Sequence, residues 1–280
     1  MGVQRSREAA RAISCKNNLA QLGLSIQNFE SSNGSLPDSV WHIEIMRFAG
    51  LENEYEQMVQ KSFSGSIQLY LCPSDNTVRP SSFSFSSYQG NSGVWPVSST
   101  SGYNGVLGIG SWNPGKVKKK LIKYSDITDG LTSTALVSEA LTGSLVSSLQ
   151  PRLRWVWELP GHPYSSSEFE ELVAACQAIP SNPIESGWRG VGAAKGTFYS
   201  IESQALLVGI TENLYNHAAP PQSPTCTNAG AIPTAIASAT SNHVAGPNLL
   251  FCDGHVESIE KDIDINVWRA CGDRDGSNPY

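Results

Sequence analysis

The hydrophobic positions of residues 4–32 predict one long amphipathic helix. Apolar residues recur there at alternating spacings of three and four, which stacks them on a single helix face. These residues are Ala12, Cys15, Leu19, Leu22, Ile26 and Phe29. The helix should end near Gly34, which can take the left-handed C-cap conformation, and Pro37 blocks further helix. We expect the apolar stripe to be buried against a sheet, because a face this long is stabilised mainly by packing.

Shorter periodic runs along the rest of the chain predict a mixture of helices and strands. In chain order they are a helical pair over Ser39–Phe63 with Gly50 as its joint, a strand over Ile67–Leu71, a strand over Arg152–Glu158, a helix over Ser166–Ile179 and a closing helix over Ile263–Cys271. Between 76 and 118 the chain is rich in Ser and Gly and has little periodicity, which is typical of ordered loops with short strands.

Residues 248–260 have the pattern of a β-hairpin. Asn248–Cys252 is a short apolar run and His255–Glu260 alternates apolar and polar residues, with Asp253 and Gly254 between the two runs. An Asp-Gly pair in this position favours a two-residue type I′ turn, which needs positive φ at both residues. Together with the closing helix, the hairpin forms the expected C-terminal unit over 241–280.

These elements place the chain in the α+β class. We predict a pilin-like order of layers: a long N-terminal helix packed on an antiparallel β-sheet, a large loop-rich insertion and a C-terminal β-hairpin. Neither a linker nor an internal repeat is evident, so the sequence predicts a single domain over 1–280.

The composition is that of a globular protein with few charges. Apolar residues make up 40% of the chain and charged residues 16%, and the net charge is −6 with a pI near 5.4. An acidic chain has no basic footprint for phosphates, so we expect no nucleic-acid partner. No run reaches the roughly 18 apolar residues of a membrane helix, and no signal peptide is evident.

Several ordered blocks of the sequence resemble one bacterial family. The C-terminal block is His243, nine further residues and then Asp253-Gly254. The earlier blocks are Ser6-Arg-Glu-Ala-Ala-Arg, Cys15-Lys-Asn-Asn-Leu, Cys72-Pro-Ser-Asp, Tyr88-Gln-Gly-Asn-Ser-Gly93 and the run from Lys123 to Glu139. Taken together, they make the chain similar to the prepilin-processing-associated, pilin-like surface proteins that are abundant in planctomycete bacteria. The resemblance implies a family motif formed by His243, Asp253 and Gly254.

The same resemblance implies a membrane-anchored structural protein. In that family a prepilin cleavage site and about 20 apolar residues, enough to cross a bilayer, precede the segment similar to residues 4–32. We therefore expect this chain to be the soluble part of an extracytoplasmic protein, anchored to the inner membrane before assembly. Its expected partners are the membrane, through the preceding segment, and other pilin-like subunits, through the N-terminal helix. The assembly would be a type IV pilus-like filament or a type II secretion pseudopilus at the cell surface.

The number and spacing of the cysteines favour long-range disulfides. The six are Cys15, Cys72, Cys176, Cys226, Cys252 and Cys271. None belongs to a Cys-x-x-Cys or Cys/His cluster with zinc spacing, so a structural zinc is not expected. An even, scattered set fits an oxidising compartment, and six buried thiols in a cytosolic protein are the alternative. Of the 15 possible connectivities, the predicted elements favour Cys15–Cys72, Cys176–Cys226 and Cys252–Cys271.

The sequence carries no recognised catalytic motif. It lacks a nucleophile elbow, a zinc-protease helix motif, a phosphate-binding loop and a dinucleotide fingerprint. His217, His243, Asp253 and His255 would converge on a metal only if distant loops met, so we expect no catalytic residue. Two alternatives stay open: a hydrolase without a recognised motif, and a surface-displayed ligand- or glycan-binding module built on the loops of 76–112.

The C-terminal tail has the spacing of oxygen ligands in a calcium loop. Asp273, Asp275 and Asn278 surround a glycine, but the bidentate acid that should follow is absent before Tyr280. Some type II secretion pseudopilins bind calcium in a C-terminal loop, which the resemblance brings into consideration. Calcium at these three residues is the cofactor that the sequence suggests, and a solvated tail is the simpler interpretation.

Overall fold

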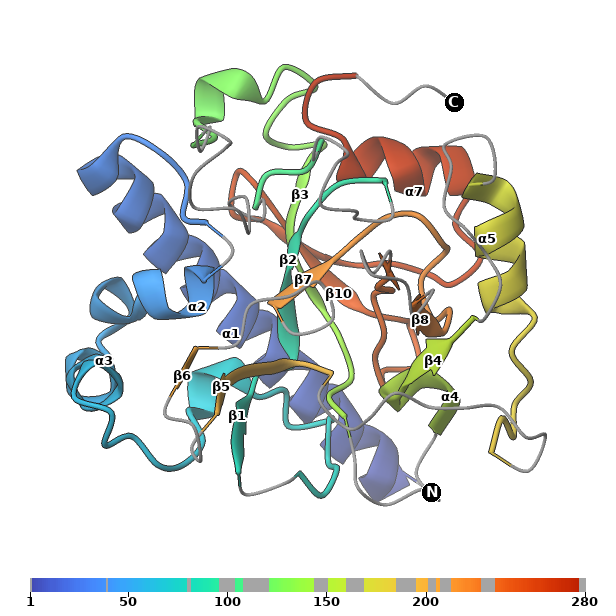
Figure 1. Cartoon of the computed structure of the whole chain (residues 1–280), viewed down its shortest axis with the longest axis horizontal. Coiled ribbons are helices and arrows are strands. Elements are labelled where there is room, and N and C mark those ends of the chain that lie inside the picture. Colours follow the sequence, from blue (N-terminus) through green and yellow to red (C-terminus); the bar gives the residue numbers. More distant parts are fainter. Residues whose placement is uncertain are drawn as a thin grey trace.

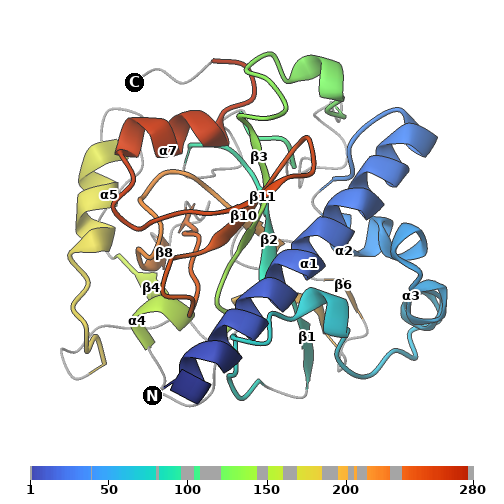
Figure 2. The same ribbon diagram turned by 180° about the vertical axis from the view of Figure 1, so that it is seen from behind.

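A long N-terminal helix lies across one face of a central sheet, and shorter helices and two small sheets lie around them (Figure 1; Figure 2). The computed structural model describes residues 2–38, 40–79, 82–95, 104–107, 121–143, 151–159, 169–184, 195–200, 205–206, 213–227 and 235–276. Over these residues the chain is an α+β fold, which confirms the predicted class. The single domain over 1–280 stays a prediction.

The helices of the described residues differ widely in length. They are α1 (Gly2–Asn33), α2 (Trp41–Glu44), α3 (Glu52–Val59), α4 (Pro151–Arg154), α5 (Phe169–Gln177) and α7 (Ile265–Gly272), with the 3₁₀ helices η1 (Met46–Ala49), η2 (Gln68–Tyr70) and η3 (Tyr124–Asp126). Among them, none combines the length and the apolar character needed to cross a bilayer.

The strands are short and form three sheets. They are β1 (Phe83–Phe85), β2 (Tyr88–Asn91), β3 (Ala135–Glu139), β4 (Val156–Glu158), β5 (Thr197–Ser200), β6 (Ala205–Leu206), β7 (Leu214–Tyr215), β8 (Thr225–Thr227), β9 (Ala235–Ile236), β10 (Asn248–Phe251) and β11 (Val256–Ser258). The five-stranded central sheet has the order β11-β10-β3-β2-β7, and the smaller sheets have the orders β1-β5-β6 and β4-β8-β9.

The central sheet is largely antiparallel, as predicted, with one parallel strand at its edge. β11, β10, β3 and β2 pair antiparallel, but β7 runs parallel to β2. In the third sheet β4 and β8 are parallel as well. Parallel neighbours require long crossover connections, and the large segments between these strands provide them.

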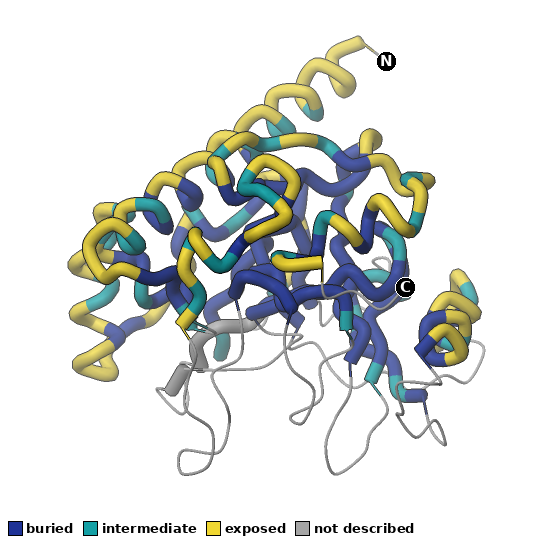
Figure 3. Tube along the Cα trace, turned by 90° about the horizontal axis from the view of Figure 1, so that it is seen from above, coloured by how far each residue is buried: buried dark blue, intermediate teal, exposed yellow. Residues whose placement is uncertain are grey.

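The stripe of α1 packs on the outer half of the central sheet, where the helix contacts β10 and β11. The fully buried residues of the stripe are Cys15, Leu19, Leu22 and Ile26. Gly23 allows a close approach, because a Cβ there would lie 3.0 Å from Leu250 Cδ1. Residues 2–7 are exposed, and this end of the helix projects beyond the rest of the chain (Figure 3). The helix predicted over 4–32 is thus confirmed with slightly wider bounds.

Strand β10 is buried on both faces, which explains its unbroken apolar run. Leu250 faces α1 and belongs to the core beneath that helix. Leu249 and Phe251 point to the other face, where they pack with Trp268 of α7. Because successive side chains of a strand point to opposite faces, β10 contributes residues to two separate cores.

A third core lies around α5. Its inward residues are Phe169, Leu172, Val173 and Cys176, as the sequence predicts, and they pack on β8 and β9 through Cys226 and Ile236. The predicted N-cap Ser166 lies outside the described residues.

One predicted strand is wrong and another is correct only in its last three residues. The strand expected over 67–71 is instead the 3₁₀ helix η2 with its two flanking residues, because the buried side chains Ile67 and Tyr70 are three residues apart and three residues make one 3₁₀ turn. The segment over 152–158 begins as helix α4 and only then becomes β4. Pro151 explains the helical start, because proline is favoured in the first turn of a helix.

The C-terminal hairpin forms, but its turn is not type I′. Leu250 pairs with Val256, and the amide of Phe251 donates to the carbonyl of His255 at 3.0 Å. Only Gly254 of the Asp-Gly pair has positive φ, at 98°. The loop is therefore a three-residue turn in which glycine takes the left-handed position of a G1 bulge.

Candidate functional site

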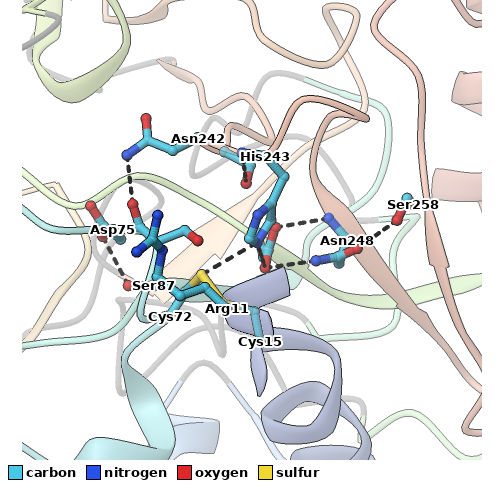
Figure 4. A network of polar contacts seen from close by, with 12 residues as sticks. Arg11, Cys15, Cys72, Asp75, Ser87, Asn242, His243, Asn248 and Ser258 are labelled. Atoms are coloured by element: carbon cyan, nitrogen blue, oxygen red, sulfur yellow. Dashed lines mark hydrogen bonds and ion pairs between the residues drawn. A yellow bond between two sulfur atoms is a disulfide. The ribbon is translucent and has the colours of Figure 1, made fainter. Parts of the chain in front are cut away.

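His243 lies at the centre of a buried polar cluster between α1 and the central sheet (Figure 4). Its Nδ1 is 2.8 Å from Oε1 of Glu8 on α1, and its Nε2 is 3.3 Å from Oε1 of Glu139 at the end of β3. The same Nε2 is 3.5 Å from Sγ of Cys72, which is bonded to Cys15. These five residues are called the His243 cluster below.

The loop that carries His243 is held by its own short-range bonds and by a glycine. The amide of His243 donates a hydrogen bond to Oγ of Ser241 at 3.2 Å, and Nδ2 of Asn242 donates to the carbonyl of Ser74 at 2.7 Å. These two hydrogen bonds hold the backbone of the loop in place. Gly246 has φ of 96°, and a Cβ there would lie 2.1 Å from the carbonyl oxygen of Ile259. Only glycine fits this turn, which aims the imidazole into the interior.

Both carboxylates of the cluster are themselves oriented by other groups. Asn248 binds Glu139 twice, through its amide at 2.9 Å and its Nδ2 at 3.0 Å. Glu8 accepts hydrogen bonds from Arg11 and, at 2.8 Å, from Ser74 Oγ. Glu139 is buried and Glu8 is partly buried. Such a fully connected network fixes the positions of its members.

The electrostatics of the cluster favour the charged form of His243. Burial lowers the pKa of His243, but hydrogen bonds and charge interactions with Glu139 and Glu8 outweigh burial and raise the pKa above its ordinary value. Burial has the opposite effect on Glu8 and raises its pKa, but hydrogen bonds from Arg11, His243 and Ser74 bring this pKa below its ordinary value. His243 therefore joins α1 to β3 by two ion pairs.

A second buried charge cluster centres on Asp75, three residues after Cys72. Its carboxylate is 2.5 Å from Nη1 of Arg154 and 3.0 Å from Nη2 of Arg79. It also accepts hydrogen bonds from Ser87 at 2.8 Å and from the amide and hydroxyl of Thr142. Arg79 belongs to the same segment as Asp75, but Ser87, Thr142 and Arg154 are distant in sequence, so Asp75 links the segment after η2 to the start of β2, the end of β3 and α4.

Lys195 lies beside this second cluster with its ammonium group buried. Nζ donates to the carbonyl of Leu153 at 2.8 Å and to Oγ1 of Thr240 at 3.2 Å. Burial, and then Arg154, lower the pKa of Lys195 to about 7 against the opposing effect of Asp75. Between the two clusters is a hollow with room for about one water molecule, too small for an organic substrate.

The histidines considered for a metal or hydrolytic site do not converge. His217 is buried against Trp268, with Nδ1 2.7 Å from the Trp268 carbonyl and Nε2 2.9 Å from Tyr215 Oη, and burial lowers its pKa to about 3. Asp253 and His255 instead pair with each other at 2.6 Å on the exposed hairpin. Of the family motif, His243 thus lies in a buried cluster, whereas Asp253 and Gly254 form a surface turn.

Two of the three expected cysteine pairs are disulfides in the structure. Cys15–Cys72 has a Cα–Cα distance of 5.0 Å and Cys176–Cys226 one of 5.9 Å, both within the usual range. The third expected pair, Cys252–Cys271, is wrong, because both residues are free thiols. Cys252 belongs to the core beneath α1, while Cys271 packs in the core on the opposite face of β10. The sheet separates them.

The two candidate calcium ligands within the described residues, Asp273 and Asp275, contact neighbouring residues of the same tail. Asp273 is buried and its Oδ1 accepts the amide of Asp275 at 3.2 Å, while Asp275 pairs with Arg274 at 3.4 Å. Asn278 lies outside the described residues. Residues 80–81, 96–103 and 108–112 of the loops over 76–112, the alternative ligand- or glycan-binding surface, lie outside them as well.

Sequence reasoning missed Glu8 and Asp75, although a signal existed. Glu8, Asp75 and Glu139 each lie inside one of the blocks that carry the family resemblance. An acid in three such blocks, together with a histidine in a fourth, could have suggested a shared polar site.

Comparison with known proteins gives one family. The family described as "Protein of unknown function (DUF1559)" matches residues 4–50 and 44–266. Comparisons with curated proteins and with solved structures gave no match.

Proposed function

Because the chain belongs to the DUF1559 family, whose members are commonly surface proteins of pilin-like type, we propose that it is a structural pilin-like subunit rather than an enzyme. Its full-length form would be anchored in the inner membrane by a segment preceding α1. Subunits would then pack through their N-terminal helices into a surface filament or a secretion pseudopilus.

The observation that carries this proposal is the way α1 is placed. Its C-terminal two-thirds packs on the sheet by one stripe, while its first turns project from the body with their side chains exposed (Figure 3). The opposite face of the helix presents large apolar side chains, with Ile13 60% and Leu24 59% exposed. A helix with a free end and two exposed apolar side chains on its free face suits packing against the same helix of a neighbour.

The covalent and polar links of α1 to the rest of the chain support a structural role for this helix. The Cys15–Cys72 disulfide joins the helix to the segment after η2, and His243 joins it to β3 through Glu8 and Glu139. Disulfides persist in oxidising compartments, which agrees with an extracytoplasmic location. In the described residues the strongest polar clusters are occupied in holding elements together, which favours a structural over a catalytic role.

Two observations test the proposal. The reading frame upstream of Val3 should encode a prepilin-type cleavage site followed by about 20 apolar residues. The 280-residue chain on its own should be monomeric or weakly associated in light scattering, because most filament contacts would run through that upstream helix. A tight oligomer that persists on dilution, or an upstream sequence without an apolar segment, would contradict the proposal.

A further inference from the structure

We propose that the chain with a reduced Cys15–Cys72 pair binds one Zn²⁺ ion between Cys15, Cys72, Glu139 and His243. Across the described residues, these four form the group of His, Cys and acidic side chains whose ligand atoms all lie within 4.8 Å of one another. All four are buried. Two thiolates, one imidazole and one carboxylate match the number and the kinds of ligand in closed zinc sites.

The distances from His243 already fit a tetrahedral ion. Zinc bonds of about 2.3 Å to sulfur and about 2.0–2.1 Å to nitrogen and oxygen place a sulfur and a nitrogen about 3.5 Å apart, and a nitrogen and an oxygen about 3.3 Å apart. Nε2 of His243 lies 3.5 Å from Sγ of Cys72 and 3.3 Å from Oε1 of Glu139. The two sulfur atoms would have to separate, to about 3.8 Å, once no covalent bond joins them. The remaining pairs of ligand atoms lie within 4.8 Å of one another and would have to settle at about 3.5 Å.

The groups behind the ligands are those that a metal site needs. The ring nitrogen of His243 that would not bind zinc, Nδ1, is hydrogen-bonded to the carboxylate of Glu8. This hydrogen bond fixes the ring and leaves Nε2 for the ion. Glu139 is oriented by two hydrogen bonds from Asn248. Asn248 is in turn fixed by Ser258 Oγ, which donates to its Oδ1 at 2.8 Å. The second layer is thus complete before any metal arrives.

Forming the site requires a two-electron reductant, either a pair of thiols or a phosphine, and it releases protons. Two reductant thiols become one disulfide, or a phosphine and water become a phosphine oxide, while Cys15 and Cys72 each gain one electron and one proton. Zinc then displaces both thiol protons, and the Nε2 proton where the imidazole is charged, as two Zn–S bonds, one Zn–N bond and one Zn–O bond form. The two states exclude each other, because the same sulfur atoms bind either one another or the ion.

Both states would hold α1 in the same place. The disulfide joins α1 to the segment after η2, and the ion would join α1 to that segment, to β3 and to the 241–247 loop. Zinc would therefore secure the N-terminal helix in chains that have not been oxidised. The sequence gives no spacing signal for this site, because its ligands come from four separate segments.

The test is a zinc titration of the full 280-residue chain in two redox states. Chain refolded under a phosphine reductant and then desalted should hold one Zn²⁺ per chain by atomic emission, whereas oxidised chain should hold none. Co²⁺ in place of zinc should give the visible bands of a tetrahedral ion and a thiolate charge-transfer band sized for two sulfur ligands. The variant H243Q, which keeps a polar side chain in the cluster, should weaken zinc binding at least about tenfold.

The double variant C176S/C226S is the matched control, since it removes the other disulfide. It should bind zinc like wild type when reduced, as should C252S/C271S, which removes the free thiols. Near-UV circular dichroism checks that each reduced chain is folded. Equal zinc binding by oxidised and reduced chain, or by H243Q and wild type, would overturn the proposal. So would a reduced chain that stays unfolded when zinc is added, or a Co²⁺ spectrum that is lost in C252S/C271S.

Discussion

Asp75 is ionised in the interior because its carboxylate is surrounded by donors. Arg154 and Arg79 supply two positive charges, and Ser87 and Thr142 supply hydrogen bonds. Burial by itself raises the pKa of Asp75, but Arg154, Arg79 and Thr142 outweigh it and bring the pKa below its ordinary value of 3.8. The contribution of this residue to folding is therefore coupled to pH.

Replacing Asp75 by Asn should destabilise the fold in a way that depends on pH. At neutral pH the loss in unfolding free energy should be about 3–5 kcal/mol, because Arg154 is left buried without its partner. Asp75 stabilises the folded state above its unfolded pKa of 3.8, and this advantage is lost as the pH falls through and below that value. Urea titrations at several pH values should show the gap between wild type and variant shrinking below about pH 4.

Asp262, which is exposed, provides the matched control for this change. Asp262→Asn should stay within about half a kcal/mol of wild type. A gap for Asp75→Asn that is the same at acidic and at neutral pH would contradict the assignment of an ionised, paired Asp75. Neutral His42 and His217 also disfavour folding in acid, but wild type and variant share that effect.

At the scale of elements, α1 is stabilised by one stripe and not by its whole surface. Leu22 is fully buried under the sheet, and Leu24, two residues further on the same helix, is 59% exposed. The two leucines have the same helix propensity. Comparing their replacement by alanine therefore distinguishes the contribution of packing from that of helix formation.

Leu22→Ala should lower the free energy of unfolding by about 2–5 kcal/mol, because it leaves a cavity in a packed core. Leu24→Ala should change it by less than about half a kcal/mol. Both values come from the same denaturant titration. Equal losses at the two positions would mean that α1 does not pack on the sheet by the Cys15–Phe29 stripe.

The structure predicts which cysteines form disulfides, and peptide mapping tests this pairing. Mapping without reduction should recover the cross-linked peptides of Cys15–Cys72 and Cys176–Cys226. Buried Cys252 should be alkylated only after denaturation, and partly buried Cys271 should react before it. Each bridge closes a loop of 57 or 50 residues and should stabilise the fold by about 4 kcal/mol in the chain-entropy model. A Cys252–Cys271 peptide would contradict the placement of these residues on opposite faces of β10.

Elements with strong local signals could be predicted from the sequence. The long periodic stripe gave α1, and the Asp-Gly pair between two apolar runs gave the hairpin. Weaker local signals misled, as at Ile67–Leu71, where the spacing of two buried side chains selects a 3₁₀ turn over a strand. The turn type was wrong because Gly254 alone supplies the left-handed residue.

The partners within the site could not be predicted, because they are distant in sequence. His243 and Glu8 are 235 residues apart, and Arg154 and Asp75 are 79 apart. Periodicity reports the face on which a residue lies but not which element lies opposite. The same limit explains the third cysteine pair, since no local pattern shows that Cys252 and Cys271 lie on different faces of one sheet.

At the scale of the whole molecule, the free surface of α1 is the one through which subunits would assemble. α1 crosses the back of the central sheet, with its first turns outside the body and its outer face uncovered (Figure 2; Figure 3). If the protein assembles through α1, this surface is buried between neighbouring subunits in living cells. The exposed face of α3 would then serve for comparison, since Val59 is 63% exposed and Ile13 on α1 is 60% exposed.

Cysteine cross-linking in intact cells measures this directly. The full-length gene product would be expressed in its native host with either Ile13→Cys or Val59→Cys, treated with a bifunctional maleimide and analysed by immunoblot. Packing through α1 predicts a ladder of multimers from Ile13→Cys and a much weaker one from Val59→Cys, with wild type remaining monomeric because its free thiols are at least partly buried. A purely monomeric Ile13→Cys protein, or equal ladders from both variants, would contradict the proposal that this chain is a pilin-like subunit.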